Sequence, residues 1–152
     1  QSLKYSGCTA CNGCKTNSDK CVLKDDLTEV LSKTEKADVL IFASPVYFGD
    51  ITGQLKCYID RLYSFFTPDF HTSDKPSRLK SGKKLIFVIS QGQQNEKMFE
   101  DIYPRYEMFL KWFGFDCSVI RAVGVRDKND AASDSNLMKQ AHTIGENLFS
   151  NS

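Results

Sequence analysis

Two uninterrupted apolar runs constrain the fold of this chain most strongly. They are Val39 to Ala43, which reads VLIFA, and Leu85 to Ile89, which reads LIFVI. Neither run alternates apolar with polar residues, and such strands are typical of a parallel sheet that helices cover on both faces. Both runs are therefore predicted to be central strands. A third run, Cys117 to Val123, is less uniform and is predicted at or near a sheet edge, and Gln1 to Tyr5 is predicted to be a short, truncated fourth strand.

Amphipathic helical patterns separate these runs. In each pattern apolar side chains recur every three or four residues, as a single buried helix face requires. The patterns span Asp25 to Lys36, Gly53 to Phe66, Glu96 to Phe113 and Ser133 to Phe149. Pro104 is expected to kink the third helix or to restart it. The stripe of the last helix that is expected to face the core consists of Leu137, Ala141, Ile144 and Leu148. The alternation of strands and helices predicts an α/β fold with a doubly wound parallel sheet in three layers.

Length and charge indicate one ordinary folded domain over residues 1–152. A chain of 152 residues can bury one sufficient core without the help of disulfides. Lys plus Arg number 20 against 19 for Asp plus Glu, a net charge of +1, so the chain lacks the basic footprint of a nucleic-acid-binding protein. The longest apolar runs have about a quarter of the length that a membrane-spanning helix needs. Neither nucleic acid nor a membrane is therefore expected as a partner.

The segment that follows the first central strand has the chemistry of a binding site for a flat aromatic ligand. It reads ASPVYFGDITGQLKCYIDR from Ala43 to Arg61. In open α/β sheets, ligands lie beyond the carboxyl ends of the strands, where this segment begins. The hydroxyls of Ser44 and Thr52 can hydrogen-bond to ring heteroatoms. The rings of Tyr47 and Phe48 can stack on a ligand, although ordinary packing is the alternative role for such a pair.

This segment closely resembles the flavodoxin-like NAD(P)H-dependent FMN reductases, in which a loop reading SPVYFG and a helix of the form xQLKxxIDR contact the flavin. The resemblance implies a flavodoxin-like fold, FMN as cofactor and NAD(P)H as a candidate electron donor. It also implies that the isoalloxazine ring contacts the loop residues Ser44, Pro45, Val46, Tyr47, Phe48 and Gly49. Gln91 and Gly92, after the second central strand, are implied to approach the ring from its other side.

Four of the six cysteines form a compact motif near the N-terminus. Cys8, Cys11, Cys14 and Cys21 read C-x2-C-x2-C-x6-C. The short gaps let a looping chain wrap three thiolates around one small inorganic core, and the longer gap lets the fourth thiolate close the site. Three interpretations stay open, namely a [4Fe-4S] cluster, a zinc ion with four thiolate ligands, and cysteines without a metal. Such clustering also favours a reducing compartment, here the cytoplasm, over a disulfide framework.

The cysteine motif, followed by Asp25-Asp26 at a helix start, is similar to that of the iron-sulfur flavoproteins. These proteins are a branch of the FMN reductase family that binds a [4Fe-4S] cluster near the flavin, and all four ligand positions of the branch are occupied in this sequence. The resemblance therefore implies that the four cysteines are metal ligands. Cys57 and Cys117 stand apart and are predicted to be buried small hydrophobic residues.

One part of the family pattern does not occur in this sequence. The family begins with a strand and a phosphate loop of the type GSPRxxGNT, whose amides and helix dipole bind the FMN phosphate. No such loop, GxGxxG or Walker motif is present. If Gln1 to Tyr5 is the second strand of a 2-1-3-4-5 sheet, the absent strand is a central one. We therefore expect the chain to be an incomplete record of a longer protein, or the gap to be filled by a second chain.

The function implied by the resemblance is that of an FMN-dependent oxidoreductase with the cysteine cluster as a one-electron relay. The cofactor supplies the chemistry, so no side chain needs to act as an acid or base, and His71 and His142 are predicted at the surface. One alternative is an NAD(P)H-dependent FMN or quinone reductase without a cluster. Another is a non-catalytic flavodoxin-like scaffold with a structural metal.

Further expectations concern partners and the end of the second helical pattern. The partner in electron transfer is expected to be a small molecule or a protein. The aromatic-rich stretch Tyr58 to Phe70 offers more apolar surface than one core-facing stripe needs, which predicts a homo-oligomer, a dimer or a tetramer. Asp60 and Arg61 are interpreted as an exposed pair or a clamp between helix and loop, and Thr67 to Gly82 as a long polar insertion.

Overall fold

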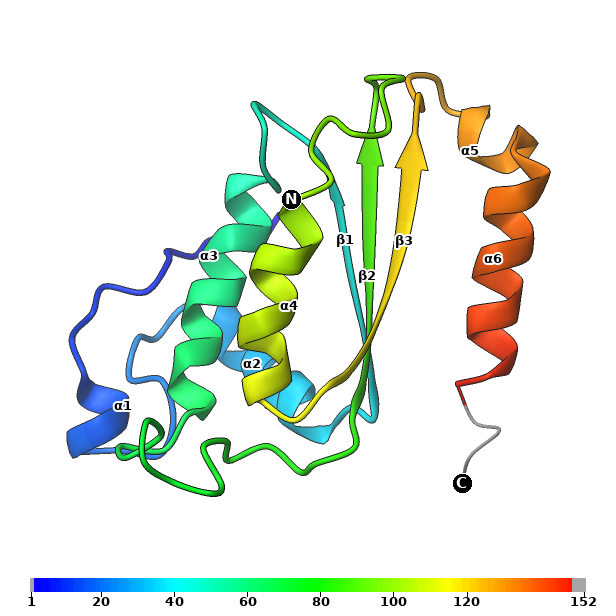
Figure 1. The fold of residues 1–152 in the computed structure, drawn as a ribbon. Coiled ribbons are helices and arrows are strands. Elements are labelled where there is room, and N and C mark those ends of the chain that lie inside the picture. The colour runs from blue at the N-terminus through cyan, green and yellow to red at the C-terminus, as the bar shows by residue number, and fades with distance from the viewer. Residues whose placement is uncertain (1, 149–152) are drawn as a thin grey trace.

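The computed structural model describes residues 2–148 and is built around a parallel sheet of three strands (Figure 1). The strands are β1 (Val39–Pro45), β2 (Lys84–Gln91) and β3 (Asp116–Val123). Their spatial order is β1-β2-β3, so β2 is paired on both sides. Because all three strands run in the same direction, the loops that follow them meet at one edge of the sheet.

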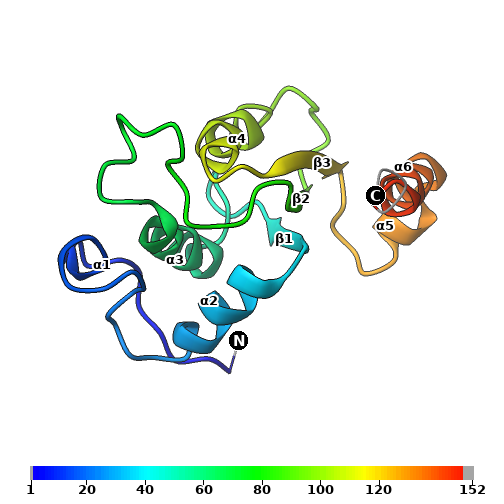
Figure 2. The same cartoon turned by 90° about the horizontal axis from the view of Figure 1, so that it is seen from below.

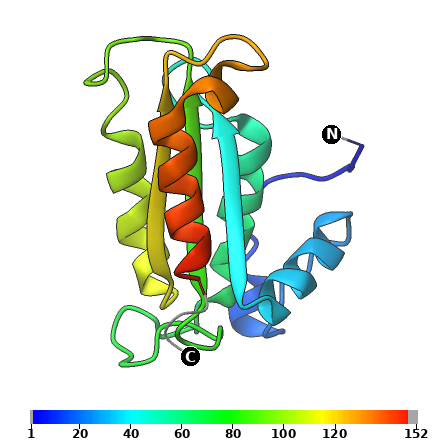
Figure 3. The same cartoon turned by 90° about the vertical axis from the view of Figure 1, so that its right-hand side faces the viewer.

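Helices lie on both faces of the sheet. α3 (Gly53–Arg61) and α4 (Ile102–Trp112) cover one face, and α6 (Ser135–Glu146) lies against the other (Figure 2). Figure 3 views the molecule from the side of α6, where this helix passes in front of the strands. The other helical segments are α1 (Gly13–Thr16), α2 (Leu27–Lys36), the 3-10 helix η1 (Leu62–Phe65) and α5 (Asp130–Ser133). The arrangement is the doubly wound, three-layer α/β fold that the sequence predicts.

Two predicted helices differ from the observed ones at their ends. The third pattern is helical only from Ile102, because residues 96–101 form turns. Pro104 therefore lies in the first turn of α4, where its missing N–H removes no helix hydrogen bond. The predicted kink or restart inside a longer helix is wrong. The last pattern is divided into α5 and α6, and its predicted end at Phe149 lies outside the described residues.

The predicted fourth strand is not formed by the described residues of its range. Ser2 to Tyr5 have no strand pairing, and Gln1 lies outside the described residues. Lys4 instead bonds to the start of α2. Its N–H donates to Asp26 Oδ2 at 2.6 Å, and the N–H of Asp26 donates to the Lys4 carbonyl oxygen at 3.3 Å. The N-terminal segment is thus bound at the start of α2 and does not join the sheet.

β1 is an edge strand within the described residues, which corrects the prediction that its run is central. It pairs with β2 alone, in a register that places Ala43 beside Val88. Phe42 is 4% exposed under the α3 and α4 layer, whereas Ile41 on the opposite face is 63% exposed. The run is therefore covered on one face only. β3, predicted at or near an edge, is also paired on one side.

The core lies between the sheet and the layer of α3 and α4. Leu85, Phe87 and Ile89 of β2 are at most 2% exposed, and they meet Ile102 and Leu110 of α4, which are equally buried. On the opposite face, α6 has no buried residue. Its predicted core-facing stripe is only half-buried, so the expectation that it enters the core is met in part. That stripe consists of Leu137, Ala141, Ile144 and Leu148.

The aromatic residues of the stretch Tyr58 to Phe70 are used inside the chain. The Phe66 ring stacks on that of Phe113 at a centroid distance of 4.0 Å and on that of Phe70 at 4.8 Å. The polar insertion is closed by the N–H of Thr67, which donates to the carbonyl oxygen of Pro76 at 2.9 Å. Phe65 and Phe66 are therefore buried within the chain, and the oligomer predicted from this stretch stays a prediction.

The difference between the two faces of the sheet predicts how substitutions in the strands affect stability. Leu85→Ala in β2 should lower the free energy of unfolding by about 3 kcal/mol, because it leaves a cavity in a tightly packed core. Ile41→Ala in β1 is the matched control and should cost under about 1 kcal/mol, because that side chain is 63% exposed. Urea denaturation followed by circular dichroism measures both values. Equal losses would show that Ile41 is covered in solution.

Candidate functional site

The end of β1 and the loop that follows it, residues 44–52, are held together at the base by hydroxyl groups, and we call this segment the aromatic loop. Ser44 is buried, and its Oγ accepts a hydrogen bond from the N–H of Thr52 at 2.9 Å and donates to the Pro45 carbonyl oxygen at 2.8 Å. The Thr52 hydroxyl oxygen in turn accepts from the N–H of Leu55 at 3.3 Å and caps α3. The Ser44 side chain therefore shapes the loop from within.

The tip of the aromatic loop presents two aromatic rings to solvent. Tyr47 and Asp50 exchange backbone hydrogen bonds of 2.9 and 3.2 Å across a tight turn. The two residues between them, Phe48 and Gly49, have φ angles of 52° and 88°. Positive φ suits Gly49, but it strains Phe48, and strain of this kind is typical of functional loops. Tyr47 is 66% exposed and Phe48 is fully exposed, so both rings are free to stack on a ligand.

Asp50 fastens the tip to α4. Its carboxylate accepts from the hydroxyl of Tyr106 at 3.0 Å and from the N–H of Ile51 at 2.7 Å, and it lies 3.5 Å from the Arg105 guanidinium. Burial and this hydrogen bond to Asp50 raise the pKa of the Tyr106 hydroxyl well above its usual range. Tyr106 therefore remains a hydrogen-bond donor to Asp50 at neutral pH.

The last residue of β2 and the loop that follows it, residues 91–98, lie beside the aromatic loop, and we call this segment the glutamine loop. The N–H of Val46 donates to the Ser90 carbonyl oxygen at 2.7 Å, which joins the two loops at the sheet edge. The Gln91 amide is buried and donates to the carbonyl oxygens of Gln93 and Asn95 at 3.0 and 3.2 Å. The side chain of Gln91 thus holds its own loop in shape.

Two arginine side chains, one from β3 and one from the segment after it, hold the glutamine loop in place. Arg121 of β3 donates to Gln91 Oε1 at 3.2 Å and to the Glu96 carbonyl oxygen at 2.9 Å. Arg126 donates from Nε to the carbonyl oxygen of Gly92 at 2.9 Å. The predicted ring contacts of Gln91 and Gly92 are thus placed at the same edge as the aromatic loop, and the contacts themselves stay a prediction.

The four clustered cysteines line one small cavity in residues 7–24, the cysteine loop. Cys8 and Cys11 are exposed, Cys14 is buried and Cys21 is half-buried. The pKa of the Cys11 thiol is lowered by the Gly13 N–H and by the Thr9 side chain, which favours its thiolate form. Within residues 2–148, no three potential metal ligands are arranged to hold a single metal ion.

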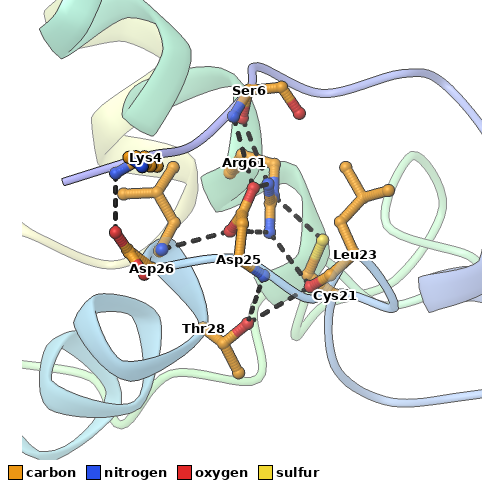
Figure 4. Close-up of polar contacts among 9 residues, drawn as sticks. Lys4, Ser6, Cys21, Leu23, Asp25, Asp26, Thr28 and Arg61 are labelled. Atoms are coloured by element: carbon orange, nitrogen blue, oxygen red, sulfur yellow. Dashed lines mark hydrogen bonds and ion pairs between the residues drawn. The ribbon is translucent and has the colours of Figure 1, made fainter.

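Arg61 connects the cysteine loop to the end of α3 (Figure 4). Its side chain is 0% exposed, and Nε donates to Cys21 Sγ at 3.0 Å. Nη1 donates to Asp25 Oδ2 at 2.8 Å and to the Ser6 carbonyl oxygen at 3.1 Å. Nη2 donates to Asp25 Oδ1 and to the Leu23 carbonyl oxygen, both at 3.3 Å. The interpretation of Arg61 as a clamp between helix and loop is confirmed.

Charge pairing makes this buried guanidinium stable. Burial disfavours the charge on Arg61, but the hydrogen bond to Asp25 and the nearby Cys21 outweigh it, and the pKa of Arg61 is raised. The same hydrogen bond lowers the pKa of the Asp25 carboxyl. Asp60, by contrast, is paired with Lys56 one turn earlier on the surface of α3.

Two more cations surround the cysteine loop, and the sequence offered no sign of either. Lys15 Nζ donates to the carbonyl oxygens of Tyr63 and Phe66 at 2.6 and 2.7 Å and lies 4.2 Å from the centre of the Tyr63 ring. Arg78 donates to the carbonyl oxygens of Ser64 and Cys14 at 2.6 and 3.2 Å. Lys15 belongs to the cysteine loop itself, whereas Arg78 lies more than fifty residues further along the chain and is brought to the site only by folding.

A cleft of about 680 Å³ extends from the cysteine loop to the aromatic loop. It contacts Cys8 of the cysteine loop and Asp50 of the aromatic loop. The aromatic and aliphatic side chains of its wall are Ile59, Tyr63, Phe66, Tyr106, Phe109, Leu110 and Phe113. Its volume is within the usual range of about 300–1,000 Å³ for small-molecule sites.

The remaining candidate residues play smaller roles. His71 and His142 are exposed, as predicted. Cys57 and Cys117 are half-buried rather than fully buried, and burial raises the pKa of the Cys117 thiol to about 11. Cys57 Sγ lies under Gly7, where an added Cβ would approach it to 3.4 Å, so Cys57 supports the start of the cysteine loop.

Comparison with known proteins identifies the family. The sequence profile described as flavodoxin-like fold matches residues 6–147, nearly the whole chain. The chain belongs to this flavodoxin-like family. Among the described residues of this flavodoxin-like chain, no helix combines the length and the apolar character needed to cross a membrane.

Curated relatives carry two kinds of names. An iron-sulfur flavoprotein from Methanosarcina thermophila is 44% identical over 96 residues, which are 63% of this chain and 47% of the relative. An FMN-dependent NADH:quinone oxidoreductase from Burkholderia pseudomallei is 30% identical over 116 residues, which are 75% of this chain and 58% of the relative. The flavodoxin-like chain thus spans about half the length of these relatives.

Solved structures confirm the fold. The chain superposes on an FMN-dependent NADH-azoreductase from Bacillus anthracis in complex with FMN with a TM-score of 0.63, at 20% identity, over 80% of this chain and 61% of that one. It superposes on an NAD(P)H:quinone oxidoreductase from Methanothermobacter marburgensis with a TM-score of 0.57, at 19% identity, over 86% of this chain and 67% of that one.

The Arg61–Asp25 pair predicts a pH-dependent contribution to stability. Asp25→Asn should lower the free energy of unfolding by about 3 kcal/mol at pH 7, because it leaves the buried guanidinium without its counter-charge. Because the pKa of Asp25 is lowered in the folded state, its contribution is present above the unfolded pKa of about 3.9 and is lost as the pH falls through the lower folded value.

Urea denaturation of the metal-free protein between about pH 3 and pH 7 measures this contribution. The gap between the parent protein and D25N should be largest near neutral pH and close as the solution becomes acidic. Asp74→Asn, at an exposed loop position, is the control and should change stability by less than about 0.5 kcal/mol. A D25N protein as stable as the parent at neutral pH would contradict the prediction.

Proposed function

We propose that the protein is an FMN-dependent oxidoreductase whose flavin ring lies on the aromatic loop. The observation that carries the proposal is the pair of exposed rings, Tyr47 and Phe48, on a strained turn at the carboxyl edge of the sheet. In this fold class ligands bind at that edge. The names of the relatives and neighbours, which include FMN-dependent NADH reductases, support the same chemistry.

The residues present fit a flavin ring. The exposed rings of the tip supply a stacking surface, and the backbone of Gly49 and the carbonyl oxygen of Val46 would supply polar groups for the ring edge, with Pro45 at the base of the loop. Ser44 acts by holding the loop closed through its bonds to Thr52 and Pro45. Gln91 and Gly92 of the glutamine loop would approach the ring from its other side. The flavin itself supplies the transfer of hydride and electrons.

We assign the four thiols of the cysteine loop to a [4Fe-4S] cluster that relays single electrons. The donor set fits such a cluster, because Cys8, Cys11, Cys14 and Cys21 line one cavity. The single compact run C-x2-C-x2-C-x6-C favours a cluster over zinc, because four-thiolate zinc sites usually pair two separated C-x2-C knuckles.

Basic groups around the thiols support the same assignment. Arg61, Lys15 and Arg78 are held by hydrogen bonds at the cysteine loop, where they would offset the negative charge of a bound cluster. All six cysteines are free, in keeping with a reducing compartment such as the cytoplasm.

The second candidate function is an NAD(P)H-dependent quinone reductase without a cluster. The relative from Burkholderia pseudomallei with the name FMN-dependent NADH:quinone oxidoreductase favours it, since its match covers 75% of this chain. In either case the electron partner is a small molecule or a protein. We further propose a homo-oligomer, now on the basis of the exposed apolar side chains of α4, which are Met108, Phe109 and Trp112.

The first test concerns the flavin ring and the loop tip. Phe48→Ala should raise the dissociation constant of FMN about five- to tenfold, because one stacked ring contributes about 0.5–1.5 kcal/mol. Titration of the full-length protein, followed by quenching of FMN fluorescence, measures the constant. Met138→Ala on α6 removes another exposed apolar side chain, far from the loop, and should leave the affinity unchanged. If FMN binds equally well to F48A, the ring does not lie on the tip.

The second test separates the relay from the simple reductase. After anaerobic reconstitution with Fe(II) and sulfide, the parent protein should be brown and contain iron and acid-labile sulfide. Cys11→Ala should lose most of both, whereas Cys57→Ala should keep them, because Cys57 lies outside the cavity. A yellow protein without labile sulfide would favour the quinone reductase.

A further inference from the structure

We propose that Arg61 sets the reduction potential of the four-cysteine site by donating its Nε–H to the Cys21 sulfur. The inference rests on the proposed function, because it requires the cluster assigned above. Arg61 is a positioning residue here, since it acts on the cluster through the thiolate that binds it. This hydrogen bond should raise the reduction potential of the cluster above the value that the cluster would have with the same four thiolates but without the donor.

The geometry leaves the guanidinium no alternative arrangement. An arginine has five N–H donors, and the five hydrogen bonds of Arg61 use all of them. The two bonds to the Asp25 carboxylate are of the bidentate kind that fixes orientation as well as distance. Nε therefore remains 3.0 Å from Cys21 Sγ, in a side chain that is 0% exposed.

The hydrogen bond is more important than the net charge of Arg61. The carboxylate of Asp25 cancels the charge of the guanidinium at 2.8 Å, so the pair is neutral as a whole. What remains at the sulfur is a directed N–H donor. Reduction adds one electron to the cluster, and part of that charge lies on the thiolate sulfurs, so a donor stabilises the reduced form more than the oxidised form.

The chain provides a matched comparison in Arg78. It also lies at the cysteine loop, but its donors go to the carbonyl oxygens of Ser64 and Cys14. The two arginines thus differ in their acceptor, which is a sulfur for Arg61 and the backbone for Arg78. Replacing each by lysine keeps the positive charge and removes the planar fork.

The experiment uses the full-length protein, reconstituted anaerobically with Fe(II) and sulfide. Iron and labile sulfide are measured first in the parent protein, Arg61→Lys and Arg78→Lys. A potentiometric titration with dithionite then follows the reduced cluster by electron paramagnetic resonance. Dithionite supplies the one electron, and no bond to Cys21 is made or broken.

We expect R61K to lower the ratio of reduced to oxidised cluster at a fixed potential about tenfold. For a one-electron couple this equals a fall of about 59 mV in the midpoint. R78K should change the ratio less than about threefold. Equal shifts in both variants, or no shift in R61K, would overturn the role of Arg61 while leaving the cluster in place.

A second measurement needs no variant. In parent protein labelled with [15N]arginine, pulsed electron paramagnetic resonance of the reduced cluster should show a 15N coupling in place of the 14N coupling. Among the described residues, the only arginine that donates to a cysteine sulfur is Arg61. If the cluster shows no arginine nitrogen, the inference fails. If the parent protein binds neither iron nor sulfide, the proposed cluster fails, and the inference fails with it.

Discussion

The parallel pairing of β1 with β2 is the interaction on which the candidate site depends. Its register carries Pro45 to a place beside Ser90, and the N–H of Val46 continues the ladder to the Ser90 carbonyl oxygen at 2.7 Å. Two loops that are more than forty residues apart in the sequence therefore leave the sheet side by side. The buried side chains of β2 keep this register, because a slip by one residue would turn Leu85 and Phe87 out of the core.

α3 connects the sheet edge to the cysteine loop. The helix begins at a cap, Thr52, whose N–H bonds to the same Ser44 hydroxyl that closes the aromatic loop. It ends nine residues later at Arg61, whose five hydrogen bonds go to Cys21 and Leu23 of the cysteine loop and to the flanking residues Ser6 and Asp25. One short helix thus joins the proposed flavin platform to the proposed cluster.

The sequence predicts local features well and tertiary ones poorly. The run at Leu85 and the SPVYFG loop are recognisable because burial on both faces and a turn after a strand leave local patterns. The expected kink at Pro104 is wrong because an apolar period continues through the turns before α4, whereas the helix starts at Ile102 with Pro104 in its first turn. The four residues that accept the five hydrogen bonds of Arg61 leave no local pattern, because they lie between 36 and 55 positions away in the sequence.

The cysteine loop shows why such long-range contacts matter for the chemistry. Residues 7–24 contain only one short helix, α1, so regular structure cannot hold the thiols in place. The loop is held instead by side chains of Arg61 and Arg78, and its own Lys15 binds back to the chain after α3. Asp25 neutralises Arg61, whereas the hydrogen bonds of Lys15 and Arg78 go to carbonyl oxygens. The negative charge of a bound cluster would offset these two cations, which would tie the stability of the loop to the group that it is proposed to bind.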